Sequence, residues 1–360
     1  MRILIMHSSL GSGGIESMVV NLANEMSKTQ DVSVCTIFDP KSTDICYNRL
    51  SRNVQFISLG KQKNGFSLQV LFRIMGLIRK GSYDVVHING FFYYYALAIL
   101  FLHRKTRFFY TVHSDAYKEN CLWDKYLIHF KKFCFVHKWM NAVTISKASQ
   151  DSFCQLYGAP NTLIYNGVPR TNVRKIDLLA YKKTERTRVL LNPARISTPK
   201  NQIMLCRVLT RLINEGFDCS LIIAGSNDDL SIFSKIEPYL SDRICYIGER
   251  DDIVSIMASA HAMCLSSIWE GMPVTLIEAL SVGCVPICTP VGGICDVIQN
   301  NSNGLLSDDI SEESYYITVK RFLQMSDSDI KEISDNCINS FSQFDIEMTS
   351  SLYIDMFTKL

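Results

Sequence analysis

Short runs of β-branched and apolar residues alternate along the chain with longer segments in which apolar residues recur at helical spacing. This alternation is typical of a mostly parallel sheet whose strands are joined by covering helices. In the first half, the predicted strands are 3–6, 32–38, 54–57, 85–88, 107–112, 142–145 and 162–164. In the second half, they are 189–192, 220–224, 244–247, 262–265 and 285–288. The pattern therefore predicts two similar α/β units in series.

A polar stretch at residues 170–188 interrupts the pattern and is interpreted as a linker. A length of 360 residues also suits two domains of moderate size better than one. In open α/β sheets ligands bind beyond the carboxyl ends of the strands, and two such sheets that face each other create a cleft. We therefore expect the site in the strand-to-helix loops.

Charge is distributed unevenly although the formal net charge is only +2. Residues 1–180 carry +11 and residues 181–360 carry −9, so the first half should prefer an anionic neighbour. The segment 126–140 mixes aromatic and cationic residues, and His103, Arg104, Lys105 and Arg107 add to its charge. This composition predicts peripheral membrane binding, with a solvated basic edge as the open alternative. Nucleic acid is a less suitable partner because no recognised nucleic-acid module is present.

The thirteen cysteines are scattered through apolar runs and form no C-x-x-C pair. Cys264, Cys284, Cys288 and Cys295 are examples, and we interpret them as small buried residues of a reducing cytosol. The longest apolar run, 91–102, is too short for a spanning helix, and residues 1–6 lack the length of a signal peptide. These features predict a cytoplasmic protein, with the inner face of the membrane as a further location, and no metal site.

The loop after the first predicted strand, 11–16, is rich in glycine and opens a helix. Gly13 and Gly14 would let backbone N–H groups approach an anion at the helix N-terminus. A dinucleotide fingerprint would need a glycine where Glu16 stands, which disfavours a dehydrogenase. A flexible turn is the open alternative.

The loop 193–201 leaves a strand of the second half and contains Arg195 and Lys200. We expect Pro199 and Lys200 in the first turn of the following helix, where a cation is unfavourable unless an anion is bound. Arg195 offers a fork for phosphate oxygens and Lys200 a point charge, so the pair could clamp a diphosphate. Two solvated surface cations are the alternative.

The segment 269–283 predicts a short helix that starts near Pro273 and is apolar nearly all round. Glu278 is its only ionisable residue, and a buried carboxylate there could accept hydrogen bonds from ribose. Glu270 precedes the helix and could bind a second polyol. The alternative gives Glu278 a structural arginine partner and leaves Glu270 solvated. The predicted donor site comprises Gly13, Gly14, Arg195, Lys200, Glu270, Gly271, Met272, Pro273, Val274, Thr275 and Glu278.

In their joint order these motifs resemble the retaining glycosyltransferases of family 4, which have the GT-B architecture of two facing Rossmann-like domains with an interdomain cleft. The matching segments are Gly13–Gly14, Thr111–His113, Asn166–Val168, Arg195 to Lys200, Glu270 to Glu278, Val291–Gly293 and Asn303–Leu306. The resemblance implies that Arg195 and Lys200 hold the donor diphosphate, Glu278 the ribose and Glu270 the transferred sugar. It places His113 near the donor sugar and Gly13–Gly14 near the phosphates or the acceptor. Catalysis would thus rest on His113, Glu270, Arg195 and Lys200.

The resemblance also implies an acceptor-side domain at 1–170, a nucleotide-sugar-binding domain at 185–343, and a last helix within 344–360 that crosses back to the first domain. We therefore expect a metal-independent transferase that uses a nucleotide sugar, most often a UDP-sugar, and extends a lipid-linked or surface polysaccharide precursor. A nucleotide-sugar epimerase of the same fold and a non-catalytic sugar-nucleotide-binding module are the alternatives. Pro169 and Asn227 depart from the family's common pattern.

Overall fold

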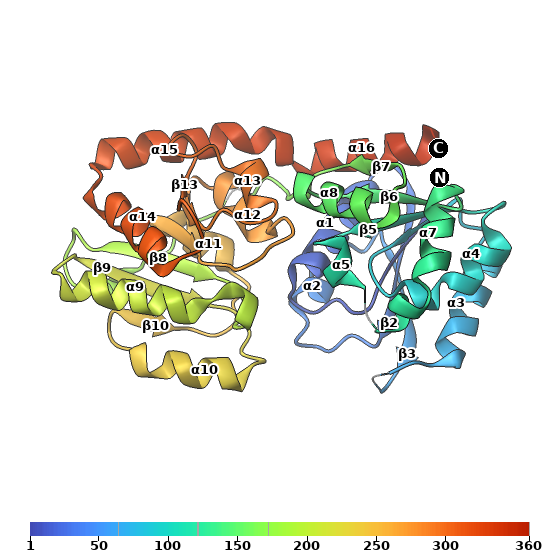
Figure 1. Ribbon diagram of the computed structural model, residues 1–360, viewed down its shortest axis with the longest axis horizontal. Coiled ribbons are helices and arrows are strands. Elements are labelled where there is room, and N and C mark those ends of the chain that lie inside the picture. The colour runs from blue at the N-terminus through green and yellow to red at the C-terminus, as the bar shows by residue number, and fades with distance from the viewer. Residues whose placement is uncertain (64, 121, 172, 360) are drawn as a thin grey trace. The chain divides into compact units, whose positions relative to one another are not determined.

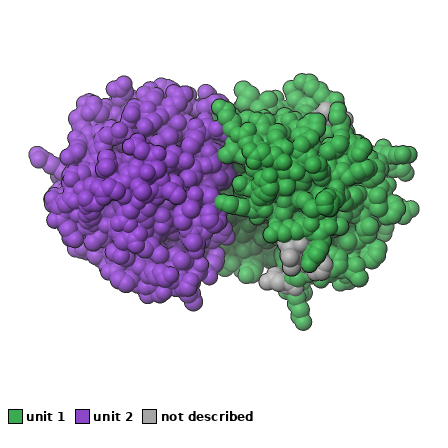
Figure 2. All heavy atoms as spheres, in the orientation of Figure 1, with its two compact units in different colours: residues 1–169, 344–360 green, residues 170–343 purple. Residues whose placement is uncertain are grey.

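The computed structural model describes residues 1–63, 65–120, 122–171 and 173–359. The chain forms two compact units, which Figure 2 colours separately. Unit 1 comprises Met1–Pro169 and Phe344–Leu360, and unit 2 comprises Arg170–Gln343. Each unit is a Rossmann-like α/β domain, so the predicted fold class is confirmed (Figure 1).

Unit 1 contains a seven-stranded parallel sheet in the order β3-β2-β1-β4-β5-β6-β7. Its strands are β1 (Arg2–His7), β2 (Asp31–Phe38), β3 (Gln55–Lys61), β4 (Val85–Ile88), β5 (Arg107–Val112), β6 (Met140–Thr144) and β7 (Asn161–Leu163). Its helices are α1 (Gly14–Met26), α2 (Ile45–Asn48), α3 (Leu68–Gly81), η1 (Phe92–Tyr94), α4 (Ala96–Leu102), α5 (Ala116–Glu119), α6 (Leu122–Tyr126), α7 (Ile128–Val136), α8 (Lys147–Tyr157) and α16 (Ile346–Lys359).

Unit 2 contains a six-stranded parallel sheet in the order β10-β9-β8-β11-β12-β13. Its strands are β8 (Arg188–Pro193), β9 (Cys219–Ala224), β10 (Ile244–Tyr246), β11 (Ala262–Leu265), β12 (Val285–Cys288) and β13 (Leu305–Leu306). Its α-helices are α9 (Gln202–Asn214), α10 (Leu230–Ile236), α11 (Ile253–Ser259), α12 (Val274–Ser281), α13 (Ile294–Val297), α14 (Glu312–Gln324) and α15 (Asp327–Ser340). Short 3₁₀ turns are η2 (Leu179–Tyr181), η3 (Thr198–Lys200), η4 (Glu237–Tyr239) and η5 (Phe341–Phe344), the last of which ends where the chain re-enters unit 1.

The C-terminal helix α16 completes unit 1 and packs against α1. Gly167 lies so close to it that an added Cβ would come within 2.4 Å of the Thr349 hydroxyl oxygen. The backbone N–H of Val168 donates to the Phe344 carbonyl, and Tyr353 Oη lies 3.2 Å from Thr111 Oγ1. Parts of the Asn166–Val168 and Thr111–His113 motifs therefore serve to dock this helix.

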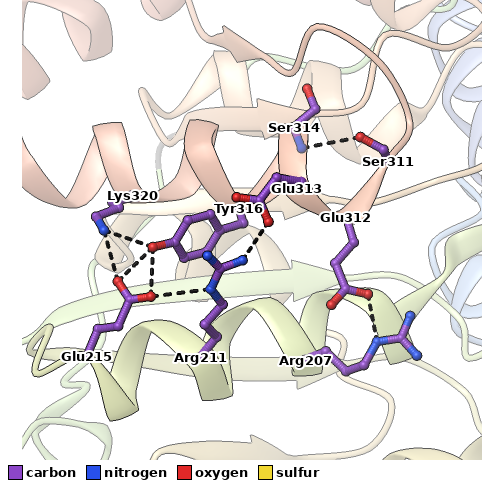
Figure 3. A network of polar contacts seen from close by, with 9 residues as sticks. All are labelled: Arg207, Arg211, Glu215, Ser311, Glu312, Glu313, Ser314, Tyr316 and Lys320. Atoms are coloured by element: carbon purple, nitrogen blue, oxygen red, sulfur yellow. Dashed lines mark hydrogen bonds and ion pairs between the residues drawn. The ribbon is translucent and has the colours of Figure 1, made fainter.

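A polar network joins α9 and α14 on the surface of unit 2 (Figure 3). The Tyr316 hydroxyl lies 2.8 and 2.7 Å from the two carboxylate oxygens of Glu215, and Lys320 Nζ lies 2.9 Å from Oε2 of the same carboxylate. Arg207 pairs with Glu312 and Arg211 with Glu313 at 2.7 and 2.6 Å. Much of the acidic charge of α14 is thus paired within unit 2.

Two cations that the sequence suggested for a basic surface are engaged elsewhere. Lys131 is 1% exposed; its Nζ donates to Asn120 Oδ1 at 2.9 Å and lies 4.1 Å from the centroid of the Tyr110 ring. Arg107 donates to the carbonyl of Phe357 in α16. Both cations are withdrawn from the surface because partners within the fold replace water around them: an aromatic ring and an amide oxygen for Lys131, and a backbone carbonyl for Arg107.

The prediction that the cysteines are buried is wrong for three of those described, since Cys154 and Cys295 are exposed and Cys245 is half-buried. Cys264, Cys284 and Cys288 are buried, whereas Cys295 is exposed. Cys295 follows buried Ile294 in α13, a single helical turn that presents only one face to the core. The thirteenth cysteine, Cys121, lies outside the described residues.

Candidate active site

Three loops of unit 2 meet at the carboxyl ends of β8, β11 and β12, which are neighbours in the sheet. They are residues 194–201, 266–273 and 289–293. Parallel strands place their following loops at one edge, which explains how sequence positions so far apart are brought together. Most of the predicted donor residues lie on these loops or on the helix that follows the second.

Arg195 is exposed, and its side chain has no polar partner in the part of the chain that the structure describes. The loop then forms the 3₁₀ turn Thr198–Lys200, and Asn201 adopts a left-handed conformation with φ of 52°. Asparagine tolerates this conformation better than most residues, and it separates the turn from α9. Lys200 therefore lies in the turn before α9 and not, as predicted, in the first turn of that helix.

Lys200 and Glu270 form an ion pair with 2.6 Å between Nζ and Oε1. The Ser267 hydroxyl also donates to Glu270 Oε1 at 2.6 Å. The Glu270 side chain is only 8% exposed, so the alternative in which it is solvated is wrong. This geometry places a fixed carboxylate directly beside the cation that was expected to bind phosphate.

The third loop closes against the second through Gly292 and Gly293. The backbone N–H of Gly293 donates to the Gly271 carbonyl at 2.6 Å. Gly292 has φ of +54°, and an added Cβ would lie 2.0 Å from the Glu270 carbonyl oxygen. Glycine is thus required here for both conformation and space, which gives the Val291–Gly293 motif a physical explanation.

Helix α12 begins at Val274 after Pro273, which is its N-cap residue. Its first N–H groups have no partner within the helix, as at every helix start. Val274, Leu276, Ile277, Ala279 and Leu280 are buried, as expected for this apolar helix. Thr275, Glu278 and the C-cap residue Val282 are instead partly exposed, so the expected burial of Glu278 is incomplete. These positions are three and four residues apart and share one face. Glu278 therefore reaches the surface of unit 2 from the same face as Thr275.

Gln202 was not singled out from the sequence, yet it shapes the Arg195 loop. It is fully buried, and its Nε2 donates to the Arg195 carbonyl at 2.9 Å. Gly225 also packs against this loop, so closely that an added Cβ would lie 2.3 Å from the Ala194 carbonyl oxygen. The available signal was a glutamine among the apolar residues of the first turn of α9.

Unit 1 carries a separate polar cluster at the carboxyl ends of β1, β4 and β5. His113 follows β5, is 7% exposed, and its Nε2 lies 2.8 Å from Asn89 Oδ1. Its backbone N–H donates to Glu119 Oε1 at 2.9 Å. Burial lowers the pKa of His113 well below its ordinary value, and His7 and His87 add to the effect. The imidazole is therefore neutral near pH 7.

Gly13 and Gly14 lie at the start of α1, as expected. The Glu16 carboxylate folds back over them, so that a Cβ on Gly13 would lie 2.2 Å from Glu16 Oε2. Glu16 Oε1 is also 3.7 Å from His7 Nε2. The space that the sequence suggested for a bound anion is thus next to a carboxylate of the chain itself.

Glu119 makes stability pH-dependent. Burial raises its pKa to about 7, although Lys131 and the His113 N–H act in the opposite direction. Because this pKa is higher than in the unfolded chain, the contribution to stability is complete below about pH 4.5 and is lost as pH rises to about 7. We expect Glu119→Gln, which keeps the acceptor oxygen, to be more stable than the wild type at pH 8 by about 1–2 kcal/mol. Urea unfolding at pH 5 and pH 8 measures this; an equal difference at both values would contradict it.

Both units are Rossmann-like domains. In unit 2, Lys200 of the Arg195 loop pairs with Glu270, and helix α12, which begins just after Glu270, carries Glu278. This combination of fold and site defines a glycosyltransferase of the GT-B class. The family description "Glycosyl transferases group 1" matches residues 174–339, and "Glycosyltransferase Family 4" matches residues 12–171. The chain belongs to the family 4 glycosyltransferases.

Individual relatives are distant. An uncharacterized glycosyltransferase of Methanocaldococcus jannaschii is 21% identical over 67% of this chain and 66% of its own length. The Campylobacter jejuni enzyme named as an alpha-1,4-N-acetyl-D-galactosaminyltransferase for a PP-undecaprenol-linked glycan is 22% identical over 96% of this chain and 95% of its own. For curated relatives from Escherichia coli and Bacillus anthracis the chain covers only 44% and 39% of their lengths. The structure of HepE from Anabaena with UDP and glucose superposes over 100% of both chains with a TM-score of 0.80 at 18% identity.

Proposed function

We propose that this glycosyltransferase moves a sugar from a nucleotide-diphosphate donor, a UDP-sugar, to a lipid-linked glycan with retention of configuration. The observation that carries the proposal is the exposed Arg195 guanidinium, unpaired with any described side chain, in the same loop as Lys200. Two cations in one loop suit a diphosphate, which Arg195 can hold in a bidentate manner. HepE was solved with UDP, and the Campylobacter jejuni relative is named for an undecaprenol-linked acceptor, which supports these substrate classes.

The proposed mechanism assigns separate tasks to the polar groups. Lys200 has three N–H donors, so it can keep Glu270 and still donate to a phosphate oxygen. The positive charges of Arg195 and Lys200 stabilise the negative charge that develops on the leaving diphosphate, which lowers the barrier to breaking the anomeric bond. Glu270 is assigned to hydroxyls of the transferred sugar, Glu278 to the ribose, and His113 to the sugar. Because Arg195 and Lys200 supply the counter-charge, no metal ion is required.

We expect UDP to raise the melting temperature more than GDP, ADP or TDP, because ligands stabilise the state that binds them in proportion to affinity. The shift should be the same with and without EDTA. UMP is the matched control, since it lacks the second phosphate and should stabilise less. Equal shifts with UMP and UDP would contradict the diphosphate clamp, and a shift lost in EDTA would contradict metal independence.

We also propose that unit 1 binds an anionic membrane through the outer face of α3 and α4, which pack against each other (Figure 1). Leu68, Phe72 and Phe101 on this face are 62%, 63% and 65% exposed. Residues 61–105 contain seven lysines and arginines and one acidic residue, Asp84. Exposed apolar side chains among unopposed cations suit a surface of anionic lipid headgroups. No helix among the described residues is long and apolar enough to cross a bilayer.

Flotation with phosphatidylglycerol vesicles tests this surface. We expect the wild type to float at low salt, to be released by high salt, and Phe72→Ser/Phe101→Ser to remain in the pellet fraction. Leu230→Ser removes a side chain that is 73% exposed on α10 of unit 2 and should float like the wild type. The proposal would be refuted if the double variant floated with the vesicles or if the wild type did not.

A further inference from the structure

Asn89 joins two histidines at the carboxyl edge of the unit 1 sheet. It follows β4, and its neighbours β1 and β5 end at His7 and just before His113. The Asn89 backbone carbonyl accepts a hydrogen bond from His7 Nδ1 at 2.8 Å. Its side-chain oxygen lies 2.8 Å from His113 Nε2. Asn89 is 1% exposed, so both contacts are shielded from water.

The orientation of the Asn89 amide follows from its other contacts. Its Nδ2 donates to the Met6 carbonyl at 3.3 Å, and its backbone N–H donates to the same carbonyl at 3.0 Å. With the amide nitrogen directed at a carbonyl, the amide oxygen must face His113. An amide oxygen can only accept a hydrogen bond, so His113 must carry its proton on Nε2.

This proton position decides what His113 can offer to a ligand. The ring is neutral near pH 7, because burial and the nearby His7 and His87 lower its pKa. A neutral imidazole with a proton on Nε2 has only a lone pair on Nδ1. Nδ1 can therefore accept a hydrogen bond from a hydroxyl but cannot donate one to a phosphate oxygen.

The backbone beyond Asn89 is also unusual. Gly90 and Phe91 have φ of 88° and 53°, so two successive residues are left-handed. This conformation is unfavourable for a phenylalanine and is retained where the surrounding structure fixes it.

We propose that Asn89 is a positioning residue that holds His113 as the Nε2–H tautomer, so that Nδ1 accepts a hydrogen bond from a hydroxyl of the transferred sugar. The sugar contact rests on the glycosyl transfer proposed above, whereas the tautomer does not. The titratable groups that face His113 are His7 from β1, His87 from β4 and Glu119 from α5.

The tautomer is measured by two-bond ¹H–¹⁵N NMR of the full chain labelled at histidine, with His113 assigned by His113→Gln. We expect the wild type to show the neutral Nε2–H pattern from pH 6 to pH 8. In Asn89→Asp the carboxylate should favour the doubly protonated ring and give an imidazolium pattern in this range. A wild type with the proton on Nδ1 would overturn the proposal.

Kinetics separate positioning from folding. We expect Asn89→Asp and Asn89→Leu to lower kcat by roughly tenfold or more, as loss of a supporting partner of a functional histidine does, with the KM for the donor nearly unchanged. Ile74→Ala removes core packing in α3 away from the cluster and controls for lost stability. Wild-type kcat in both Asn89 variants would overturn the sugar contact. If the wild type shows the Nε2–H tautomer of His113 but transfers no sugar, the proposed function is refuted while the tautomer assignment stands.

Discussion

Arg195→Ala is expected to lower donor turnover by about 100- to 1,000-fold while the melting temperature stays within about 1 °C of the wild type. The loss is large because, in the proposed clamp, the guanidinium contacts the diphosphate most strongly as that group leaves. Stability should be preserved because Arg195 is exposed and makes no polar side-chain contact with the described residues. Arg321→Ala, an exposed arginine in the last turn of α14, is the matched control and should retain full turnover.

Lys200→Ala should lose turnover to a similar extent but should also destabilise the protein. Its removal leaves Glu270, 8% exposed, with the Ser267 hydroxyl and without its cation. An uncompensated carboxylate of this kind costs about 1–3 kcal/mol. Wild-type turnover in either variant, measured as nucleotide release under saturating acceptor, is incompatible with the proposed clamp.

Gly292→Ala is expected to destabilise unit 2 by about 2–4 kcal/mol and to abolish most turnover. The added Cβ would lie 2.0 Å from the Glu270 carbonyl oxygen, so the loop that fixes Glu270 must move. Its backbone φ of +54° adds conformational strain.

Gly248→Ala isolates the conformational part of this effect. Gly248 also has positive φ, of 74°, but no described atom lies near the position of an added Cβ. We expect this variant to lose only about 1 kcal/mol and to keep its turnover. Equal urea midpoints for the two variants would show that the contact with Glu270 does not matter.

The fold could be predicted well from the sequence because its strands are buried on both faces. The run Ala262–Leu265 is apolar throughout, and Val85–Ile88 contains a single polar residue, His87; both runs are bounded by polar residues. Every predicted strand is present, whereas β13 was missed. It contains only Leu305 and Leu306, and two residues cannot display a period.

The site was less predictable, because its geometry depends on contacts between loops. Nothing local to Lys200 or Glu270 indicates that they pair, since they are 70 positions apart. Lys131 was interpreted as a surface cation because an aromatic cage formed by β5, η1 and α8 leaves no periodic signal in α7. Asn89 gave no signal at all, as its partners come from two other strands.

We propose that the chain transfers sugar from a nucleotide diphosphate to an acceptor and that Arg195 is needed for this transfer. The most direct measurement incubates the 360-residue chain with radiolabelled UDP-sugars, with and without undecaprenol-linked glycans, and follows the label by chromatography. We expect label in the lipid-linked fraction with the wild type, only slow hydrolysis of the donor without acceptor, and almost no transfer with Arg195→Ala. Epimerised donor in the absence of acceptor, or undiminished transfer by Arg195→Ala, would contradict it.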